Sequence, residues 1–450
     1  MDKMTIQDAA AICSGTISGQ FSSELITGNI VIDSREVHVG DLFVAFRGEK
    51  VDGHDYIGSA FDRGAACCLA ERVPDGEERC IIVVNSVQTA VEKLAAAYRD
   101  RFDIPIVGIT GSVGKTTAKE MISAVLERRF HVLKTEGNLN NRIGVPMMLS
   151  RLGKEHEAAV IEMGISEFGE MSCLAQMVHP TIAVYTVIGH AHLEFLHDLN
   201  GVLKAKSEML EFMQDISPVV VNGDDPMLAG LQCRQRKILY GFSDRCDVRP
   251  EHIRVDGETT KCDIVCGNRR IPVVIPAFGR HHISAALSAA AVGMLLGLSD
   301  NEIGEGIAAF QNVGRRSELI HTGFVTLFDD SYNANPDSVR TGIDMLVQMP
   351  GERHICILGD MLELGTESLQ LHYGVGKYAQ EQGVDLVLTS GSLAREASRA
   401  MGTNGIHFET RDALITELPE LLHKGDCVLV KASKGSHFEI ISAAIKQMNA

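Results

Sequence analysis

One stretch of the sequence has the residue types and spacing of a phosphate-binding loop: Gly108 to Thr117, which reads GITGSVGKTT. It follows the apolar run 104–107, expected to be a buried strand, and precedes 118–128, where apolar residues recur at helical spacing. Glycines in such a loop allow backbone N–H groups to approach phosphate oxygens closely. We therefore expect Lys115 to reach the β- and γ-phosphates of a bound ligand and the Thr116 hydroxyl to hold Mg²⁺.

The loop departs from the common phosphate-loop pattern at one position. Ile109 stands where that pattern has a glycine, before Gly114, and the spacing here is G-x-x-G-x-x-G-K-T. The alternative interpretation is a tight strand-to-helix turn that binds nothing. The Gly-Lys-Thr-Thr sequence between a strand and a helix favours the phosphate site.

Polar residues at the ends of later strands are further candidates for chemistry. Glu162 follows the apolar run 158–161, and ligands of parallel sheets sit beyond the carboxyl ends of strands. Glu162 is therefore a candidate for holding Mg²⁺ or positioning water, and a surface acid is the alternative. His190 and His192 follow another strand and would face the same way on an extended segment. Their alternative role is a hydrogen-bonded polar edge.

Length and composition describe the scaffold that must position these residues. The chain has 450 residues, enough for about three domains, and its 45% hydrophobic content supports several packed cores. A net charge of −17 disfavours nucleic acid or an anionic membrane as the main partner. The 11 cysteines include no C-x-x-C pair, the N-terminus has no signal sequence, and the most apolar helix (284–298) is too short for a bilayer. We expect a cytoplasmic protein with reduced thiols and no stable membrane insertion.

We predict an α/β fold of three domains, with limits 1–103, 104–314 and 315–450. In the small first domain, the segment 33–35 (Asp-Ser-Arg) follows a strand and could bind a polar ligand such as a nucleotide, or form a solvated turn with a local ion pair. The segment 237–276 has short β-type runs, typical of an antiparallel insert. Alternation of strands and helices elsewhere is typical of parallel sheets, and polar clusters at strand ends of the third domain suggest a second ligand edge facing the first. The expected strands include 30–32, 41–46, 132–134, 158–161, 182–187, 219–221, 325–328 and 355–358, with others near Leu386 and Val428, and 282–297 is expected to be a core helix.

Together these motifs resemble the Mur ligase family, the amide-forming ligases of peptidoglycan precursor synthesis, over nearly the whole chain. GITGSVGKTT has that family's own glycine spacing. The other motifs that carry the resemblance are, in order, DSR (33–35), DGHD (52–55), GNLNN (137–141), EMG (162–164), HAH (190–192), AKSE (205–208), NGDD (222–225), DDSYNANP (329–336), GDMLELG (359–365) and KASKG (431–435). DSR, DGHD, DDSYNANP and GDMLELG together are characteristic of the member that adds a dipeptide. The D-N-P-R motif of the member that adds the third residue is absent.

The resemblance implies an ATP-dependent amide ligase that works through an acyl phosphate. It implies a small N-terminal α/β domain that binds the UDP-linked substrate, a central phosphate-loop ATPase domain with a parallel sheet, and a Rossmann-like C-terminal domain. The implied ligands are ATP, two Mg²⁺ ions, UDP-N-acetylmuramoyl-tripeptide and D-alanyl-D-alanine, and we expect a monomer. One alternative is another amino acid or folate ligase of the same superfamily, although DSR and GDMLELG speak against folate. A non-catalytic nucleotide switch is the alternative from a different class.

The resemblance also implies roles for individual residues, carried over by motif. The implied catalytic residues are Lys115, Glu162, His192 and Lys206. Thr116 and Glu162 would hold one Mg²⁺, His192 would help to hold a second, and Lys206 matches a lysine that becomes carbamylated and so serves as a metal ligand. The implied ATP contacts are Gly111, Ser112, Val113, Gly114, Lys115, Thr116, Thr117, Asn138, His282, Arg316 and Asp330. The implied substrate contacts are Ser34, Arg35, Asn140, Asn141, Tyr332, Asn333 and Asn335.

Two departures from the family pattern affect these assignments. The family helix usually opens H-N-x-x-N-A, whereas here His282 and Ala285 replace the two asparagines after His281. The first asparagine normally contacts adenine, so either His282 takes over that hydrogen bond or the base binds differently. Arg315 directly precedes Arg316, which leaves the assignment of the hinge arginine open by one residue.

Overall fold

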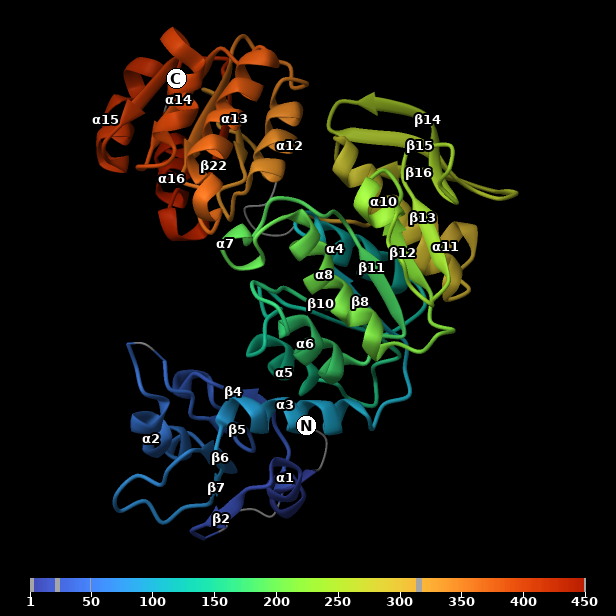
Figure 1. The fold of residues 1–450 in the computed structure, drawn as a ribbon, viewed down its shortest axis with the longest axis vertical. Coiled ribbons are helices and arrows are strands. Elements are labelled where there is room, and N and C mark those ends of the chain that lie inside the picture. Colours follow the sequence, from blue (N-terminus) through green and yellow to red (C-terminus); the bar gives the residue numbers. More distant parts are fainter. Residues whose placement is uncertain (1–3, 21–24, 49, 313–317, 449–450) are drawn as a thin grey trace.

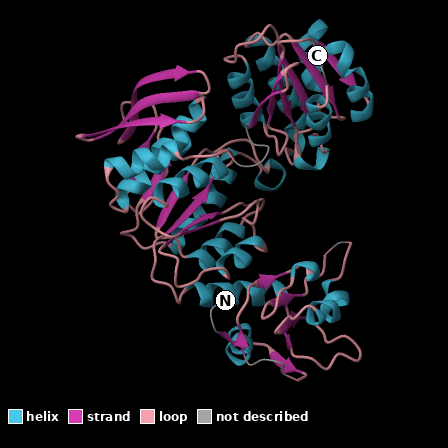
Figure 2. Cartoon of the chain, turned by 180° about the vertical axis from the view of Figure 1, so that it is seen from behind, coloured by secondary structure: helices cyan, strands magenta, loops and turns pink. Residues whose placement is uncertain are grey.

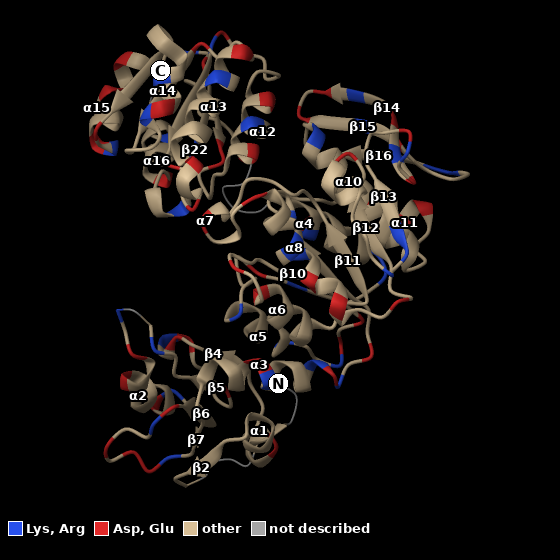
Figure 3. Cartoon of the chain, viewed as in Figure 1, with Lys and Arg blue, Asp and Glu red and all other residues tan. Residues whose placement is uncertain are grey.

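The protein consists of three α/β units that follow one another along the chain. The structure is a computed structural model that describes residues 4–20, 25–48, 50–312 and 318–448. The N-terminal and C-terminal units lie at opposite ends of the long axis, with the central unit between them (Figure 1). Helices flank the strands of the units (Figure 2), and charged residues occur along the chain in all three (Figure 3). The predicted fold class, α/β with three units, is confirmed.

The N-terminal unit is a five-stranded sheet with helices on both faces. Its elements are β1 (Met4–Thr5), α1 (Ile6–Cys13), β2 (Thr16–Ser18), β3 (Leu25–Ile26), β4 (Ile30–Val31), η1 (Ser34–Glu36), β5 (Leu42–Val44), η2 (Gly53–Tyr56), α2 (Ile57–Asp62), β6 (Cys67–Ala70), β7 (Ile81–Val83) and α3 (Val87–Arg99). The sheet order is β2-β7-β6-β5-β4, with β2 antiparallel to β7 and the other pairs parallel. Apolar residues of α1 and α3 pack on one face, and those of α2 on the other.

Helix α3 joins this unit to the next one through buried polar contacts. The Tyr98 hydroxyl donates a 2.6 Å hydrogen bond to the carbonyl of Leu152. The Arg99 guanidinium, which is 8% exposed, donates to the carbonyls of Val178 at 2.8 Å and His179 at 3.2 Å. The two units also share one continuous apolar core. The N-terminal unit is therefore packed against the central unit.

The central unit contains the largest sheet. Its elements are β8 (Ile106–Thr110), α4 (Lys115–Leu126), β9 (Val132–Lys134), α5 (Gly144–Leu149), β10 (Ala158–Glu162), α6 (Glu170–Val178), β11 (Ile182–Tyr185), α7 (Leu193–Leu196), α8 (Leu199–Ser207), η3 (Glu208–Phe212), β12 (Val219–Asn222), α9 (Pro226–Ala229), β13 (Lys237–Tyr240), β14 (Val248–Asp256), β15 (Thr259–Cys266), β16 (Arg269–Ile275), α10 (Arg280–Leu295) and α11 (Asp300–Ala308). The strand order is β16-β15-β14-β13-β12-β11-β8-β10-β9. Helices α4, α10 and α11 contribute to the core on one face, and α5, α6 and α8 to that on the other.

The prediction for the segment 237–276 was only partly right. Strands β14, β15 and β16 are antiparallel to one another, as expected. However, β13 pairs parallel to β12, and β14 begins parallel to β13. Ile238 and Tyr240 of β13 are buried in the same apolar core as Val220 of β12, and this strand extends the parallel sheet before the antiparallel insert begins.

The C-terminal unit is a six-stranded sheet covered on both faces. Its elements are β17 (Glu318–His321), β18 (Thr326–Asp329), α12 (Pro336–Leu346), β19 (His354–Gly359), η4 (Gly365–Glu367), α13 (Ser368–Glu381), β20 (Leu386–Ser390), α14 (Arg395–Met401), η5 (Gly402–Asn404), β21 (Gly405–Phe408), α15 (Arg411–Leu421), β22 (Cys427–Lys431), η6 (Lys434–Ser436) and α16 (Glu439–Lys446). The order is β17-β18-β22-β19-β20-β21, and β17 alone among these described strands is antiparallel to its neighbour. Helices α12, α13 and α14 pack on one face, and α15 and α16 on the other. Within the described ranges of the whole chain, none of the helices has the length and apolar character to cross a bilayer.

Candidate active site

The phosphate-loop sequence lies between β8 and α4, as predicted. Gly111 and Gly114 have φ angles of 149° and 82°, which side-chain-bearing residues rarely adopt. A Cβ at Gly111 would also overlap with Thr186 Oγ1, whose hydroxyl donates a 2.5 Å hydrogen bond to the carbonyl of Val113. Position 111 thus requires glycine both for its backbone conformation and because Thr186 lies so close to it. Helix α4 begins at Lys115, so the loop also receives the partial positive charge of a helix N-terminus.

Glu162 lies at the end of β10, next to this loop, and is 1% exposed. Both of its carboxylate oxygens accept hydrogen bonds: Thr116 Oγ1 donates at 2.9 Å and Asn140 Nδ2 at 2.8 Å. Lys115 Nζ donates a 2.7 Å hydrogen bond back to the carbonyl of Gly111. A hydroxyl and a carboxylate side by side are oxygen ligands that suit Mg²⁺, which completes its coordination with phosphate oxygens and water. The donor set therefore fits the cation that the sequence predicted here.

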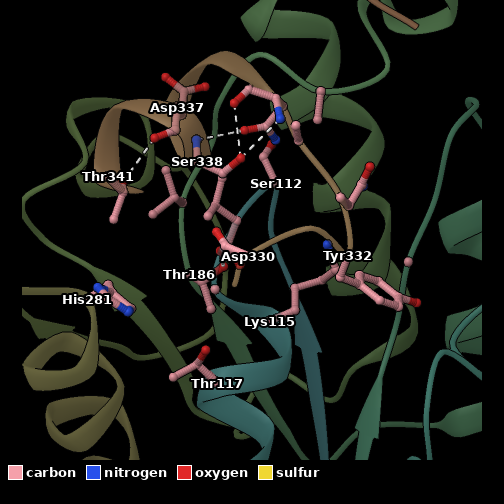
Figure 4. Close-up of a pocket in the computed structure, with 18 of the residues that line it drawn as sticks. Ser112, Lys115, Thr117, Thr186, His281, Asp330, Tyr332, Asp337, Ser338 and Thr341 are labelled. Carbon is pink, nitrogen blue, oxygen red and sulfur yellow. Dashed lines mark hydrogen bonds between the residues drawn. The ribbon is translucent and has the colours of Figure 1, made fainter. Parts of the chain in front are cut away.

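A cavity of about 560 Å³ lies between the central and C-terminal units. From the central unit it is lined by residues that follow β8, β10 and β11, and from the C-terminal unit by residues that follow β18, β19 and β22. Figure 4 shows Lys115 and Thr117 of the central unit together with Asp337, Ser338 and Thr341 of α12. Both groups come from the carboxyl ends of parallel strands, where ligands of such sheets bind. The two predicted ligand edges face one cavity.

Most of the residues predicted for the site line this cavity, and a few do not. Those that line it are Ser112, Val113, Gly114, Lys115, Thr117, Asn138, Asn140, Asn141, Glu162, His192, Asp330, Tyr332, Asn333 and Asn335. Those described elsewhere are Ser34, Arg35, Gly111, Thr116, Lys206 and His282. Arg316 and the neighbouring Arg315 lie outside the described residues.

Lys206 lies on α8 and is 1% exposed. Burial, and then the nearby charge of Lys115, hold the pKa of its ammonium group well below the ordinary value of lysine. Among the described residues, no carboxylate or hydrogen-bond acceptor contacts Lys206 Nζ. Burial without a counter-charge favours the neutral amine, which is the form that reacts with CO₂ to give a carbamate.

Two histidines of the central unit reach carboxylates of the C-terminal unit. The His190 backbone N–H donates a 2.6 Å hydrogen bond to Asp337, and His190 Nδ1 lies 3.0 Å from the same carboxylate oxygen. This contact raises the pKa of His190. His192 Nδ1 lies 2.5 Å from Glu363 Oε2, and the contact lowers the pKa of Glu363. These pairs connect the segment after β11 with the first turn of α12 and with the loop after β19.

The expectation that both histidines face the same way on an extended segment was wrong. His192 has a φ of 57° and caps the short helix α7, so the backbone turns sharply between the two side chains. Each ring therefore meets a different carboxylate. Among the described residues, no group of three or more His, Cys, Asp or Glu side chains is arranged to hold a metal ion without help from a ligand.

The cavity wall in the C-terminal unit is built from fixed loops. Lys431 Nζ forms a short ion pair with Asp330 and donates a 3.0 Å hydrogen bond to the carbonyl of Asn333. Asn335 caps α12, since its Oδ1 accepts a 2.8 Å hydrogen bond from the Ser338 backbone N–H. Asp330 and Asn335 thus have structural partners as well as positions in the cavity.

The assignment of His282 to adenine is not supported by the geometry. His282 Nδ1 lies 2.7 Å from the carbonyl of Phe278 and Nε2 lies 3.3 Å from Asn312 Oδ1, so both ring nitrogens already have partners away from the cavity. His281 lines the cavity instead, and neither of its buried ring nitrogens has a hydrogen-bond partner among the described residues. Burial lowers the pKa of His281 well below the ordinary value, which favours the neutral ring. Ala285, the other departure, also lines the cavity.

Ser34 and Arg35 lie in the N-terminal unit, on η1. Ser34 is 6% exposed, whereas the Arg35 side chain is exposed and bonded to Asp33, which it contacts at 2.6 Å. Hydrogen bonds from Arg35 lower the pKa of Asp33 to about 2. The local ion pair considered from the sequence is therefore present, together with an exposed guanidinium.

Several residues that line the cavity were not predicted. They are Thr186, Ser284, Asp337, Ser338, Thr341, Glu363, Lys431, Ser433 and Lys434. Some had a usable signal, because Glu363 stands inside GDMLELG, Lys431 and Lys434 stand inside KASKG, and Asp337 directly follows DDSYNANP. Thr186 and Ser284 had none.

Three family models match the chain. The model described as the Mur ligase middle domain matches residues 109–293, that described as "Mur ligase, glutamate ligase domain" matches 315–434, and that described as "Mur ligase family, catalytic domain" matches 27–107. Relatives named UDP-N-acetylmuramoyl-tripeptide–D-alanyl-D-alanine ligase are 32% identical in Bacillus subtilis, over 98% of both chains, and 34% identical in Escherichia coli, over 99% of both.

Solved structures agree with these relatives. A crystal structure of MurF from Acinetobacter baumannii matches with a TM-score of 0.91 and 29% identity over 99% of both chains. The MurF ligase of Thermotoga maritima, crystallised in complex with ADP, matches with a TM-score of 0.82 and 28% identity, over 94% of this chain and 98% of that one.

Proposed function

The chain belongs to the Mur ligase family, and from this we infer that it joins D-alanyl-D-alanine to UDP-N-acetylmuramoyl-tripeptide at the expense of ATP. The observation that carries this function is the single cavity that brings the phosphate loop and Glu162 together with the strand ends of the C-terminal unit. The product is a UDP-linked pentapeptide precursor of peptidoglycan. Another amino acid or folate ligase is not favoured, because relatives of this name match over the full length.

The chemistry requires two steps at one carboxyl group, the first at the γ-phosphorus of ATP and the second at the acyl carbon. A carboxylate oxygen of the tripeptide attacks the γ-phosphorus of ATP, ADP leaves, and an acyl phosphate forms. The amine of the dipeptide then attacks the acyl carbon, phosphate leaves, and the nitrogen loses a proton. Negative charge develops on the phosphoryl group and then on the tetrahedral intermediate. In this proposal Lys115 and the N-terminus of α4, which line the cavity, stabilise the first of these charges.

We propose that Thr116 and Glu162 hold one Mg²⁺ with the phosphates of ATP, and that His192 and a carbamylated Lys206 serve a second. Bound Mg²⁺ would supply charge neutralisation of the phosphoryl group. The Thr116–Glu162 contact and the burial of Lys206 without a counter-charge support these roles. His192 is bonded to Glu363 here, so the two side chains would face that cation together.

The remaining assignments are also proposals. Asn138 and Asp330 contact the nucleotide, with Asp330 on the ribose, and Arg316, which lies outside the described residues, is a further ATP contact. Ser34 and Arg35 bind the uridine end of the substrate. Asn140, Asn141, Tyr332, Asn333 and Asn335 contact the substrates within the cavity. The domains end near residues 103 and 314, and the protein works as a cytoplasmic monomer that binds neither nucleic acid nor membrane.

The decisive experiment measures phosphate release by the pure protein with Mg-ATP, UDP-N-acetylmuramoyl-tripeptide and D-alanyl-D-alanine, omitting each component in turn. We expect release only when all are present, with a product that is heavier by the dipeptide. Release that does not need the dipeptide, or no release at all, would contradict the function.

A further inference from the structure

Three lysines of the described chain line the cavity, and they differ in their partners. Lys115 is bonded to the carbonyl of Gly111, and Lys431 is paired with Asp330. Lys434 is exposed, and among the described residues no carboxylate or hydrogen-bond acceptor contacts its ammonium group. The ammonium group lies over the Tyr332 ring, whose centre is 5.9 Å from Nζ. Lys434 is therefore a cation of the cavity wall that pairs with no anion in the described part of the chain.

The loop that carries Lys434 is held by hydrogen bonds to two neighbouring loops. Ser433 Oγ accepts a 2.9 Å hydrogen bond from the Leu362 backbone N–H and donates at 3.3 Å to the carbonyl of Ala334. The Ser433 backbone N–H donates at 3.0 Å to the carbonyl of Asp360. The three loops follow β18, β22 and β19, which are adjacent in the sheet. Lys434 thus lies on a segment that is held in place beyond the carboxyl ends of three adjacent parallel strands, where ligands of such sheets bind.

The surface beside Lys434 is small and apolar. Leu362 lines the cavity and is 45% exposed, although it is a large aliphatic side chain. Gly435 lies beneath it, and a Cβ there would meet Leu362 Cδ1 at 3.4 Å. Ala334 and the Tyr332 ring line the same wall. An unpaired cation next to apolar groups and small residues matches a carboxylate that is attached to a short aliphatic side chain.

We propose that Lys434 binds the terminal carboxylate of the incoming dipeptide, with Leu362 and Tyr332 against its C-terminal methyl group. This inference rests on the proposed function. The dipeptide carries an amine that must reach the acyl phosphate and a carboxylate at its other end. The phosphates of ATP have the glycine loop and Lys115, so Lys434 is available for a carboxylate of another substrate, and the apolar groups beside it suit the C-terminal alanine of the dipeptide. Binding it at Lys434 also keeps a second carboxylate away from the phosphoryl group.

The test compares D-alanyl-D-alanine with its C-terminal amide, in the wild type and in Lys434→Met. With the wild type we expect the amide to have a KM about 10- to 100-fold above that of the free acid, the usual worth of a hydrogen bond between charged groups. In Lys434→Met the KM for the free acid should rise by a similar factor, and acid and amide should become nearly equal. The KM values for ATP and the UDP-linked substrate should stay within about twofold, and Lys434→Arg should restore most of the preference for the acid.

Lys424→Met is the matched control, because Lys424 is an exposed lysine of the same unit that does not line the cavity. It should behave as the wild type. The inference is overturned if the wild type accepts acid and amide equally, if Lys434→Met keeps the preference for the acid, or if the loss falls on ATP instead. If the wild type turns over neither dipeptide, the proposed function itself fails, and that result is distinct from the others because it needs no variant.

Discussion

Replacing Glu162 by glutamine removes the charge of this carboxyl group while leaving its hydrogen bonds possible. Glu162 accepts from the Thr116 hydroxyl at 2.9 Å and from the Asn140 amide at 2.8 Å. A glutamine can keep its oxygen towards Asn140 and turn its amide towards Thr116, whose hydroxyl can rotate to accept. We therefore expect the free energy of unfolding of Glu162→Gln to change by less than about 1 kcal/mol.

The same substitution should have a large effect on turnover. The Glu162 carboxylate is 1% exposed, so water screens its charge only weakly. Two unit charges about 4 Å apart interact by about 4 kcal/mol at an effective dielectric constant near 20. Each 1.4 kcal/mol corresponds to a factor of about ten in rate. If this charge acts on the bound nucleotide and its Mg²⁺, kcat/KM should fall by about 10³-fold.

The assay is phosphate release over a series of Mg²⁺ concentrations, with urea denaturation of the same samples. Glu136→Gln is the control, because Glu136 is an exposed carboxylate that pairs with Arg151 on the surface, and it should stay within about twofold of the wild type. Turnover of Glu162→Gln within about threefold of the wild type, with an unchanged Mg²⁺ dependence, would refute the assignment. A loss of several kcal/mol in stability would show that the charge serves the fold instead.

Three further variants test other parts of the structure. Lys115→Ala should lower turnover by at least about 10²–10³-fold without unfolding the protein, because it removes a charged contact to the phosphoryl group; near-normal phosphate release would contradict the loop assignment. Lys206→Met should raise the free energy of unfolding by about 1–3 kcal/mol in bicarbonate-free buffer, because it removes a buried amine without a described counter-charge, and should abolish turnover; an active variant would exclude the carbamate role. Arg99→Met should lower the free energy of unfolding by about 2–4 kcal/mol in urea, because buried carbonyls lose their donor, whereas the neighbouring Arg101→Met should change it by less than about 0.5 kcal/mol; equal effects would refute this reasoning.

Local patterns were sufficient to predict the phosphate loop and its setting. Strand β8, the glycine loop and helix α4 are consecutive in sequence, so the spacing of their residues determines the geometry of the loop. Glu162 was also predictable, because the end of a buried parallel strand is a restricted place. In both cases the position of the residue follows from the backbone of the element that carries it.

The choice between His281 and His282 could not be made from the sequence. Consecutive residues of a helix point about 100° apart, so only one of them can face the cavity, and which one depends on how α10 is rotated. That rotation is set by apolar residues such as Ile283, Ala286 and Leu287, which pack against the central sheet. The packing turns His282 towards Phe278 and Asn312, and His281 towards the cavity.

The partners of His190 and His192 were beyond any local pattern as well. Asp337 and Glu363 lie 147 and 171 residues further along the chain, in another unit. These contacts form only when the C-terminal unit stands against the central unit in the present arrangement. No spacing within the segment 189–194 contains that information.

The cavity belongs to neither unit alone, and the same two contacts lie between the units beside it. The glycine loop and Glu162 supply one wall, the loops after β18, β19 and β22 supply the other, and the histidine–carboxylate pairs bridge them. His192 and Glu363 are both groups that can bind a cation, and they already face each other at 2.5 Å across the two units. A cation that enters between them would replace a proton-mediated contact by a metal-mediated one at the same place. If His192 and Glu363 hold the second cation that we propose, the approach of the two units and the assembly of that cation site are a single event.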